Sequence, residues 1–250
     1  MDKKVTCLIP ARYGSTRLPG KPLKVLAGKT LIEWVWLRAK EAETVDRVII
    51  ATDDKRILET VEGFGGECVM TDPDLPSGTD RIASAIENQS GDIIINLQGD
   101  EPLFPGKNLD LLANVLINNP ELEMATLGYP LNNWNDVENP NVVKVVTDIN
   151  NMALYFSRSP IPYLRDKHSS EFPAGLYMKH LGVYAYRRDV LQKFVSLPQS
   201  NLEKTEKLEQ LRAIENSIEI KVIQSLSDSI GVDTPEDLAR AETILNESLG

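Results

Sequence analysis

The chain has 250 residues, of which 42% are hydrophobic and 26% are charged, and its formal net charge is −10. This composition is typical of a globular protein with one large or two small domains. The acidic balance argues against a nucleic-acid surface, and no apolar run approaches the ~20 residues that span a bilayer. A small anionic substrate in a local basic pocket remains compatible with it. Cys7 and Cys68 lie in strand-like runs, which predicts free thiols and a reducing, cytoplasmic compartment.

The first part of the chain alternates predicted strands and helices. Short apolar runs rich in β-branched residues predict strands at 5–9, 47–51, 67–71 and 93–97. Helical periodicity predicts helices at 31–43, from about 54 to 63, at 79–89 and at 108–118. Thr30 and Glu33 are expected to form a capping box, and Asp53 or Asp54 is expected to cap the second helix. This alternation predicts an α/β fold, with a mostly parallel central sheet and helices on both faces.

After residue 120 the pattern changes. Strands are expected at 124–129, 142–147, 152–158 and 177–187, with a hairpin turn at 148–151 and a mobile surface loop at 165–175. The chain then returns to helices at 188–196 and 202–216, a strand at 219–224, and a last helix that begins at Pro235. We interpret residues 1–250 as a single domain with a strand-rich lobe inserted at about 125–187.

Residues 9–23, IPARYGSTRLPGKPL, concentrate positive charge in an acidic chain. They follow a buried strand and precede a helix, where ligands bind in open α/β sheets. Backbone N–H groups beside glycines can approach phosphate oxygens. Arg12, Arg17 and Lys21 could supply charge to a triphosphate and stabilise departing pyrophosphate. The alternative is a surface turn with solvated basic residues, but their concentration favours an anion site.

This loop does not match the common phosphate-binding patterns. Five residues separate Gly14 from Gly20, where a P-loop has four, and Pro22 stands where a Ser or Thr would hold magnesium. The chain also lacks G-x-G-x-x-G. A P-loop kinase and a nicotinamide dehydrogenase are therefore disfavoured.

IPARYGSTRLPGKPL resembles the signature of the sugar-activating nucleotidyltransferases, and specifically of the 3-deoxy-D-manno-octulosonate (Kdo) cytidylyltransferase family. Further stretches of the family occur in the expected order: ATDD (51–54), SGTDR (77–81), NLQGDEPL (96–103), ALYFSRSPIPY (153–163), KHLGVYAYRR (179–188), LEKTEKLEQLR (202–212) and GVDTPEDL (231–238). The resemblance implies a Rossmann-like nucleotidyltransferase fold and transfer of CMP from CTP to the anomeric hydroxyl of Kdo. It also implies release of pyrophosphate, Mg²⁺ as cofactor, a role in lipopolysaccharide biosynthesis, and a homodimer formed through the inserted lobe.

Two carboxylates are candidate metal ligands. Asp100 follows the strand at 93–97, where magnesium binding and helix capping are equally expected from the spacing alone. Asp233 precedes the last helix, and its position alone favours a plain N-cap. The resemblance implies that both bind Mg²⁺, so that Asp100 joins Arg12, Arg17 and Lys21 as a catalytic residue. Glu101 is expected to alternate away from this site.

The resemblance also implies two sets of binding residues. The predicted nucleotide-binding residues are Pro10, Ala11, Arg12, Arg17, Lys21, Thr52, Asp53, Ser77, Gly78, Thr79, Arg81 and Gln98. From position alone, Asp53, Ser77 and Thr79 are as well explained as helix caps. The predicted sugar-binding residues are Gln98, Arg158, His180, Tyr184, Glu209 and Gln210.

An acidic sugar calls for a cation that can bind a carboxylate. Arg158 ends a predicted strand and is the candidate for an arginine fork, with a surface salt bridge as the alternative. A lone strand histidine such as His180 is more often structural. Tyr184 lies at a strand period of two from His180, so both side chains should face the same way.

Other readings stay open at this point. The acceptor could be 8-amino-3,8-dideoxy-manno-octulosonate or another sugar acid. A glycosyltransferase would need a D-x-D pattern at a strand end, whereas Asp72 and Asp74 lie in a Pro-rich turn. A sugar-nucleotide sensor would be favoured by loss of the basic loop residues or of Asp100 or Asp233, all of which are present.

Overall fold

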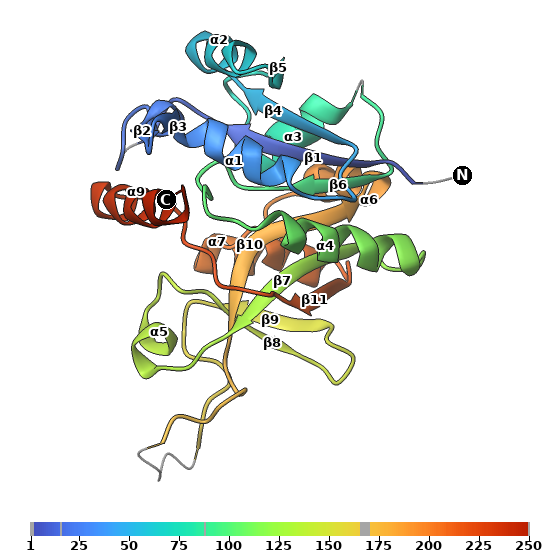
Figure 1. Cartoon of the computed structure of the whole chain (residues 1–250). Helices are drawn as coiled ribbons and strands as arrows, with labels where there is room; N and C mark the ends of the chain where they lie inside the picture. The colour runs from blue at the N-terminus through green and yellow to red at the C-terminus, as the bar shows by residue number, and fades with distance from the viewer. Residues whose placement is uncertain (1–2, 16, 88, 166–170, 250) are drawn as a thin grey trace.

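The N-terminal strands of the main sheet lie parallel to one another, and all but the edge strand at 67–70 are largely buried. Figure 1 shows a computed structural model of the chain, which describes residues 3–15, 17–87, 89–165 and 171–249. These strands are β1 (Val5–Ala11), β4 (Arg47–Thr52), β5 (Glu67–Met70) and β6 (Ile93–Asn96). Strand β1 pairs with β4 and β6, and β4 pairs with β5. Because all are parallel, their carboxyl ends share one edge of the sheet.

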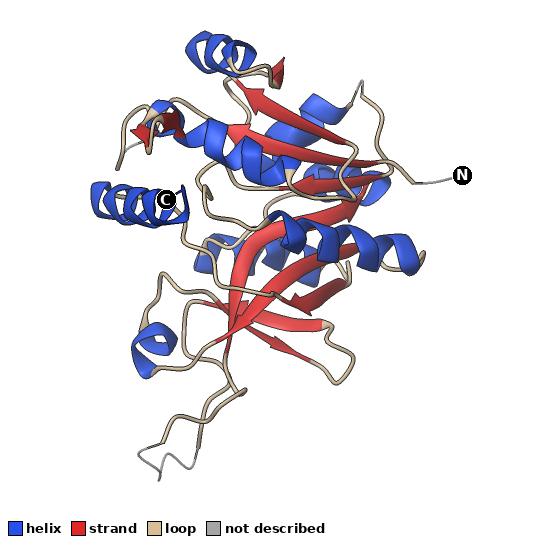
Figure 2. Ribbon diagram, in the orientation of Figure 1, coloured by secondary structure: helices blue, strands red, loops and turns tan. Residues whose placement is uncertain are grey.

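Helices cover both faces of this sheet (Figure 2). One layer consists of α1 (Leu31–Lys40), α2 (Lys55–Gly63), α4 (Gly106–Asn118) and α9 (Pro235–Leu249). The other consists of α3 (Gly78–Ile86), α6 (Arg188–Ser196), α7 (Asn201–Glu206) and α8 (Gln210–Glu215). Side chains of β1 pack against both layers, because Cys7 and Ile9 belong to one core cluster and Leu8 to the other. The predicted α/β class is thus confirmed.

The C-terminal strands extend the same sheet. They are β7 (Met124–Pro130), β8 (Lys144–Thr147), β9 (Ala153–Ser157), β10 (Met178–Arg187) and β11 (Ile220–Gln224). Strand β10 runs antiparallel between β6 and β7, and β11 lies parallel to β7. The full order is β11–β7–β10–β6–β1–β4–β5, with β8 and β9 attached beside β10. Much of the predicted lobe, 125–187, therefore belongs to the main sheet, and the division of the chain into domains stays a prediction.

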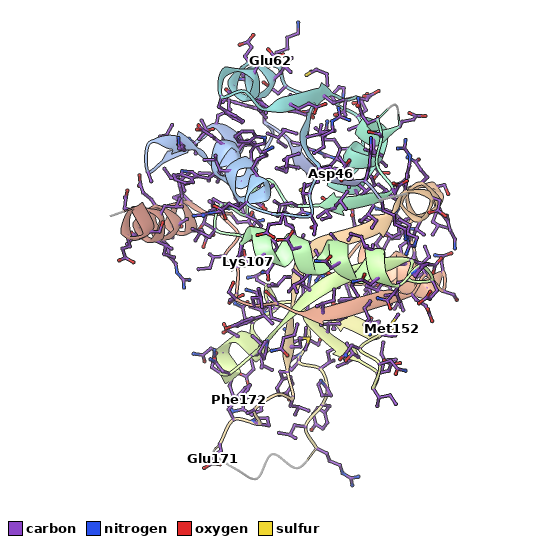
Figure 3. All side chains as sticks on the ribbon, turned by 45° about the vertical axis from the view of Figure 1, so that its right-hand side comes forward. Asp46, Glu62, Lys107, Met152, Glu171 and Phe172 are labelled. Carbon is purple, nitrogen blue, oxygen red and sulfur yellow. The ribbon has the colours of Figure 1, made fainter. Side chains whose placement is uncertain are left out.

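A third, smaller core lies below the main sheet in Figure 1, around α5 (Trp134–Glu138), a helix that the sequence did not predict. Phe172, labelled in Figure 3, packs its ring 5.2 Å from that of Trp134. Tyr177 completes the aromatic group, with a centroid 5.7 Å from Trp134. Residues 166–170 of the predicted loop at 165–175 lie outside the described residues. No helix of the described chain is long and apolar enough to cross a membrane.

The predicted helix at 202–216 is wrong as a single helix. Helix α7 ends at Glu206, and Lys207 then adopts a left-handed backbone conformation with φ of 56°. Helix α8 begins afresh at Gln210. Leucine and glutamate periodicity is continuous through this stretch, so the sequence shows no break. The contacts that hold the break come from residues far away in the chain.

The helix caps predicted for the first two helices are confirmed in part. Thr30 caps α1 by accepting a hydrogen bond from the N–H of Glu33, but the Glu33 carboxylate bonds to Lys29 instead of completing a capping box. Asp54 caps α2. Helix α1 ends at Lys40, three residues earlier than predicted. Three short elements of the basic region, η1 (Lys21–Leu23), β2 (Val25–Leu26) and β3 (Lys29–Thr30), were not predicted.

Candidate functional site

The basic loop encloses a cavity at the carboxyl ends of β1 and β6. This cavity has a volume of about 380 Å³. Its wall includes seven of the predicted nucleotide-binding residues: Pro10, Ala11, Arg12, Arg17, Lys21, Gly78 and Gln98. The backbone after β6 passes very close to β1 here. A Cβ on Gly99 would lie only 2.6 Å from the carbonyl oxygen of Pro10. Glycine is thus required where the loop after β6 passes β1.

Two carboxylates from distant parts of the chain meet at one ammonium group. Lys21 Nζ lies 2.7 Å from Asp100 Oδ2 and 2.9 Å from Asp233 Oδ1. Arg17 adds a second cation, 3.1 Å from the other oxygen of Asp233. Burial lowers the pKa of Lys21, but the two carboxylates outweigh burial and leave that pKa above its ordinary value. The convergence of Asp100 and Asp233 at one sheet edge is confirmed.

The chemistry of this pair fits a magnesium ion. Among the described residues, no group of three or more His, Cys, Asp or Glu side chains could hold a metal. Proteins that bind Mg²⁺ with substrate phosphates, however, commonly supply only one or two carboxylates. Asp100 and Asp233 already direct oxygens at a common cation. They are therefore suited to such a partly hydrated ion.

A second, larger cavity of about 670 Å³ adjoins the first. Both cavities include Gln98 and Asp233 in their walls. Five of the six predicted sugar-binding residues line the larger cavity: Gln98, His180, Tyr184, Glu209 and Gln210. A ligand group in one cavity can therefore reach a ligand group in the other beside the carboxylate pair.

His180 is a neutral hydrogen-bonding group in the wall of the larger cavity. Its Nε2 lies 3.0 Å from the hydroxyl of Thr126, which donates to the carbonyl of Val183. Thr126 therefore accepts from Nε2–H, and Nδ1 is left to accept from the amide of Gln210 at 3.5 Å. Burial lowers the pKa of His180 to about 3. The ring thus stays uncharged at neutral pH.

The predicted common face of His180 and Tyr184 is confirmed, although β10 is irregular between them. The strand carries two extra residues relative to β7 between Leu181 and Tyr184. Because two residues restore the alternation of side chains, both rings line the cavity, with centroids 5.3 Å apart. The carbonyl of Gly182, freed within this irregularity, accepts a hydrogen bond from Gln98 at 3.3 Å.

The start of α3 connects the two cavities. Ser77 caps this helix and exchanges hydrogen bonds with Asp80. Gly78 faces the smaller cavity and Thr79 the larger one. The hydroxyl of Thr79 donates to Glu209 at 2.7 Å, which fixes the carboxylate of a predicted sugar-binding residue.

Four predicted nucleotide-binding residues line neither cavity: Thr52, Asp53, Ser77 and Arg81. The fully buried Arg81 bonds to Asp53 at 2.8 Å and also to Thr71. The hydroxyl of Thr52 accepts a hydrogen bond from the N–H of Asp54. This network ties α3 to the ends of β4 and β5, and the predicted contact of Thr52, Asp53 and Arg81 with a nucleotide stays a prediction. Arg12 reaches toward the same region and donates to the carbonyl of Leu75 at 2.7 Å.

Arg158 also lines neither cavity. Its guanidinium donates to backbone carbonyls of Glu206 and Pro140, at 2.8 and 2.9 Å. Its predicted contact with a sugar carboxylate therefore stays a prediction. The D-x-D stretch forms a turn as expected, since the Asp72 side chain accepts from the N–H of Asp74 at 2.8 Å.

Comparison with known proteins agrees with this geometry. A family model described as cytidylyltransferase matches residues 6–220. The chain belongs to the cytidylyltransferase family. It is 51% identical over 249 residues to the 3-deoxy-manno-octulosonate cytidylyltransferase of Thermodesulfovibrio yellowstonii, covering 96% of this chain and 97% of that one. It is also 51% identical over 243 residues to the 8-amino-3,8-dideoxy-manno-octulosonate cytidylyltransferase of Shewanella baltica, covering 95% and 97%.

The fold of a solved structure is similarly close. CMP:2-keto-3-deoxy-manno-octonic acid synthetase complexed with CTP superimposes with a TM-score of 0.92 at 42% identity, covering 98% of this chain and 99% of that one. The central sheet with its two helical layers is therefore the nucleotidyltransferase fold that the sequence predicted.

In this cytidylyltransferase Glu101 lies away from the cavity that Asp100 lines, as expected, but strand alternation is not the reason. Strand β6 ends at Asn96, and the N–H of Glu101 donates back to the carbonyl of Gln98 in a turn. Strand alternation does not apply in a turn, and Glu101 lines the larger cavity. Ser229 donates a hydrogen bond to its carboxylate. Burial, aided by the charge of Asp100, raises the pKa of Glu101 to about 7.

The sequence analysis also missed several charged residues of the larger cavity. Lys179 lines it and bonds to Asp228 at 2.7 Å. Lys207 and Arg240 line it as well, and among the described residues neither has an ion partner within 4 Å. Lys179 lies on β10, Lys207 lies at the end of α7 and Arg240 lies within α9. Although two of them fall in stretches that resemble the family, only the fold shows that all three line one cavity.

Proposed function

We propose that this protein transfers CMP from CTP to the anomeric hydroxyl of Kdo and releases pyrophosphate. The observation that carries the proposal is the arrangement of two adjoining cavities that share Gln98 and Asp233. Membership of the cytidylyltransferase family and likeness to a synthetase complexed with CTP support the nucleotide. The 3-deoxy-manno-octulosonate cytidylyltransferase similar to this chain supports the acceptor.

In this proposal the smaller cavity holds the triphosphate of CTP. Arg12, Arg17 and Lys21 face it and would neutralise the charge that develops on departing pyrophosphate. Pro10, Ala11 and Gly78 also line it, and none of the three carries a long side chain that would obstruct the phosphates. Lys21 is held in place by its two carboxylates before the nucleotide enters.

Asp100 and Asp233 would hold Mg²⁺ beside the α-phosphate. The ion supplies Lewis-acid stabilisation of the reacting phosphoryl group and lowers the pKa of a nearby hydroxyl. The chain's own contribution is to fix two oxygen donors on one side of the phosphate. The main-chain hydrogen bond from the N–H of Val232 to the carbonyl of Asp100, at 2.8 Å, connects the two segments.

The larger cavity would hold the sugar acid. Glu209 and Gln210 can bind its hydroxyls, and the uncharged His180 supports Gln210. Lys207 and Arg240 add positive charge that suits an acidic sugar. The anomeric oxygen then forms its bond to the α-phosphorus, the bond to the bridging oxygen of pyrophosphate breaks, and the hydroxyl proton passes to solvent.

The second candidate acceptor is 8-amino-3,8-dideoxy-manno-octulosonate. The relative from Shewanella baltica that carries this name is as similar to the chain, at 51% identity, as the Kdo-named relative. Pyrophosphate release should be measured with CTP, UTP or ATP, each with Mg²⁺ and either sugar. Release with CTP and Kdo confirms the proposal, and preference for the amino sugar changes the acceptor but keeps the mechanism. Absence of release with every pair contradicts it.

We also propose that the protein is a homodimer formed through the strand-rich lobe. Three large apolar side chains on or beside this lobe are strongly exposed: Ile149 at 98%, Leu154 at 58% and Tyr163 at 86%. An interface that covered these side chains would bury their apolar surface. Light scattering of the wild-type protein should give twice the chain mass, and Leu154→Glu with Tyr163→Glu should give a monomer.

A cytoplasmic location and a role in lipopolysaccharide biosynthesis complete the proposal. The thiols of Cys7 and Cys68 are free, as a reducing compartment requires. Depletion of the protein in its host should cause the sugar acid to accumulate in the cytoplasmic fraction and to disappear from lipopolysaccharide. An unchanged sugar content would contradict this role.

A further inference from the structure

Arg158 joins two segments of backbone that lie far apart in the sequence. It follows β9 directly, and its guanidinium donates to the carbonyl of Pro140 at 2.9 Å. The same guanidinium donates to the carbonyls of Glu206 and Lys207, at 2.8 and 3.5 Å. Arginine's planar set of donors is suited to bridging several fixed acceptors at once.

A buried lysine fixes the same region from the inside. Lys144 is fully buried, and its Nζ donates to the carbonyls of Asn139, Val142 and Arg158, at 3.0, 2.6 and 2.6 Å. Its three N–H donors therefore all have acceptors, which a buried ammonium requires. Burial, followed by the charge of Arg158, lowers the pKa of Lys144. We call Lys144 and Arg158 together the carbonyl clamp.

The carbonyl clamp holds two walls of the larger cavity. Residues 141–143 form one of these walls, and residues 207–210 form another. Arg158 binds a carbonyl at the edge of each, and Lys144 fixes the first wall from behind. Glu206 reinforces the contact, because its carboxylate accepts from the N–H of Arg158 at 3.0 Å.

The second wall, residues 207–210, begins at a helix break that needs hydrogen-bond donors from elsewhere in the chain. Lys207 stands in the left-handed backbone region, which is costly for a residue with a side chain. The helix break there also leaves the last carbonyls of α7 without helical partners. Arg158 supplies donors to two of those carbonyls. Just beyond the break lie Glu209 and Gln210, the residues proposed to bind the sugar.

We propose that Lys144 and Arg158 are positioning residues for the acceptor, which set the distance between the two cavity walls and thereby place Glu209 and Gln210. This inference rests on the proposed function, since it concerns the same cavity. It differs from the predicted arginine fork, because Arg158 acts through backbone carbonyls and does not touch the sugar carboxylate.

Arg187 provides a matched control for Arg158. Its guanidinium also donates to three backbone carbonyls, those of Leu116, Asn119 and Leu122, and it lines neither cavity. We expect Arg158→Ala to raise the acceptor KM about tenfold or more and to change the CTP KM less than twofold. Arg187→Ala should lower thermal stability similarly while leaving both KM values unchanged. Equal effects of the two variants on the acceptor KM would overturn the proposal.

Glu206→Ala, alone and combined with Arg158→Ala, distinguishes the carbonyl clamp from an arginine fork, in which the Arg158 guanidinium would bind the sugar carboxylate directly. Glu206→Ala removes the carboxylate that bonds to Ser157 Oγ at 2.6 Å and to the N–H of Arg158, while it keeps the Arg158 guanidinium. If both residues act through the position of one wall, Glu206→Ala raises the acceptor KM too, and the effects of the two substitutions combine less than multiplicatively. An unchanged acceptor KM in Glu206→Ala would support the fork and contradict the clamp.

Hydrogen exchange tests the clamp independently of activity. In the protein without substrates, Arg158→Ala should speed amide exchange at 141–143 and 207–210, whereas Arg187→Ala should not. If Arg158→Ala fails to fold, Arg158→Lys, which keeps a single cation, should show the same exchange pattern to a smaller degree. Unchanged exchange in both walls would refute the clamp. A failure of the proposed reaction would instead appear as lack of pyrophosphate release by the wild-type protein.

Discussion

The two cavities are built in different ways. The smaller one is lined largely by residues from 10–15 and 17–22, which continue the chain from the end of β1. The larger one takes its walls from separate segments, including β10, the turn after β6, the break before α8 and the loop before α9. Binding residues that lie in one stretch can be recognised from the sequence as a motif. Binding residues that come from several segments can be recognised together only once the fold is known.

Their electrostatics differ as well. In the smaller cavity Arg17 is 66% exposed and Lys21 is shared by two carboxylates, so charged groups are available to an incoming triphosphate. In the larger cavity His180 is buried and neutral, and Glu209 is held by a hydroxyl. This difference suits a highly charged donor in one cavity and a hydroxyl-rich acceptor in the other.

The largest expected effect tests the junction of the cavities. Asp100→Asn should lower kcat by about a thousandfold or more while the fold is kept, because an amide is a poor ligand for a cation. The measurement is pyrophosphate release over a range of Mg²⁺ concentrations. Asp110→Asn is the control, since that carboxylate bonds to Thr44 and lines neither cavity. Normal turnover of Asp100→Asn at limiting Mg²⁺ would contradict the assignment.

A second substitution tests whether Arg81 contacts the nucleotide or only stabilises the fold beside the smaller cavity. Arg81→Met leaves the mostly buried Asp53 without its partner, which should cost about 3 kcal/mol of unfolding free energy. The KM for CTP should stay within twofold of the wild-type value. Urea unfolding and steady-state kinetics measure the two quantities. A large rise in the KM for CTP with little loss of stability would place Arg81 on the nucleotide.

A third substitution tests the connection between the cavities at α3. Thr79→Val removes the hydroxyl that donates to Glu209 and should raise the acceptor KM about tenfold, the effect of about one lost hydrogen bond to a charged group. Thr44→Val is the matched control, because that hydroxyl donates to Asp110 away from both cavities. If the two substitutions change the acceptor KM alike, Glu209 is not held for the sugar.

The smallest expected effect concerns the neutral state of His180. Its pKa is about 3 in the folded protein and near the ordinary 6.5 when unfolded. Its contribution to stability is therefore complete above pH 6.5 and declines as the pH falls toward 3, because the unfolded chain takes up a proton that the folded chain refuses. The difference in Tm between wild type and His180→Gln should shrink by a few degrees from pH 7 to pH 4.5. A difference independent of pH would show that His180 is not buried in its neutral form.

Much of the fold could be predicted from the sequence because its signals are local. Apolar runs predicted the strands, and the α/β alternation predicted the sheet with its two helical layers. The left-handed Lys207 could not be predicted, since its break is held by Arg158 from another segment. Helix α5 was missed for a similar reason, because Trp134 gains its packing partners, Phe172 and Tyr177, only in the folded lobe.

The residues of the site also divide into those that local sequence could predict and those that depend on long-range contacts. The meeting of Asp100 and Asp233 followed from their positions at the ends of elements and from the resemblance to a family. The place of Glu101 in the larger cavity was missed because strand alternation was extended into a turn. A guanidinium such as that of Arg158 can bind a substrate carboxylate or backbone carbonyls, and residue type alone does not distinguish the two.

The central claim is that the triphosphate and the sugar acid occupy separate cavities that meet at Gln98 and Asp233, beside Asp100. The most direct test is a crystal structure with CTP, Mg²⁺ and an unreactive acceptor that lacks the anomeric hydroxyl. The account predicts phosphates against Arg12, Arg17 and Lys21, with the sugar against Glu209. Phosphates in the larger cavity, or a sugar bound away from Glu209, would contradict it.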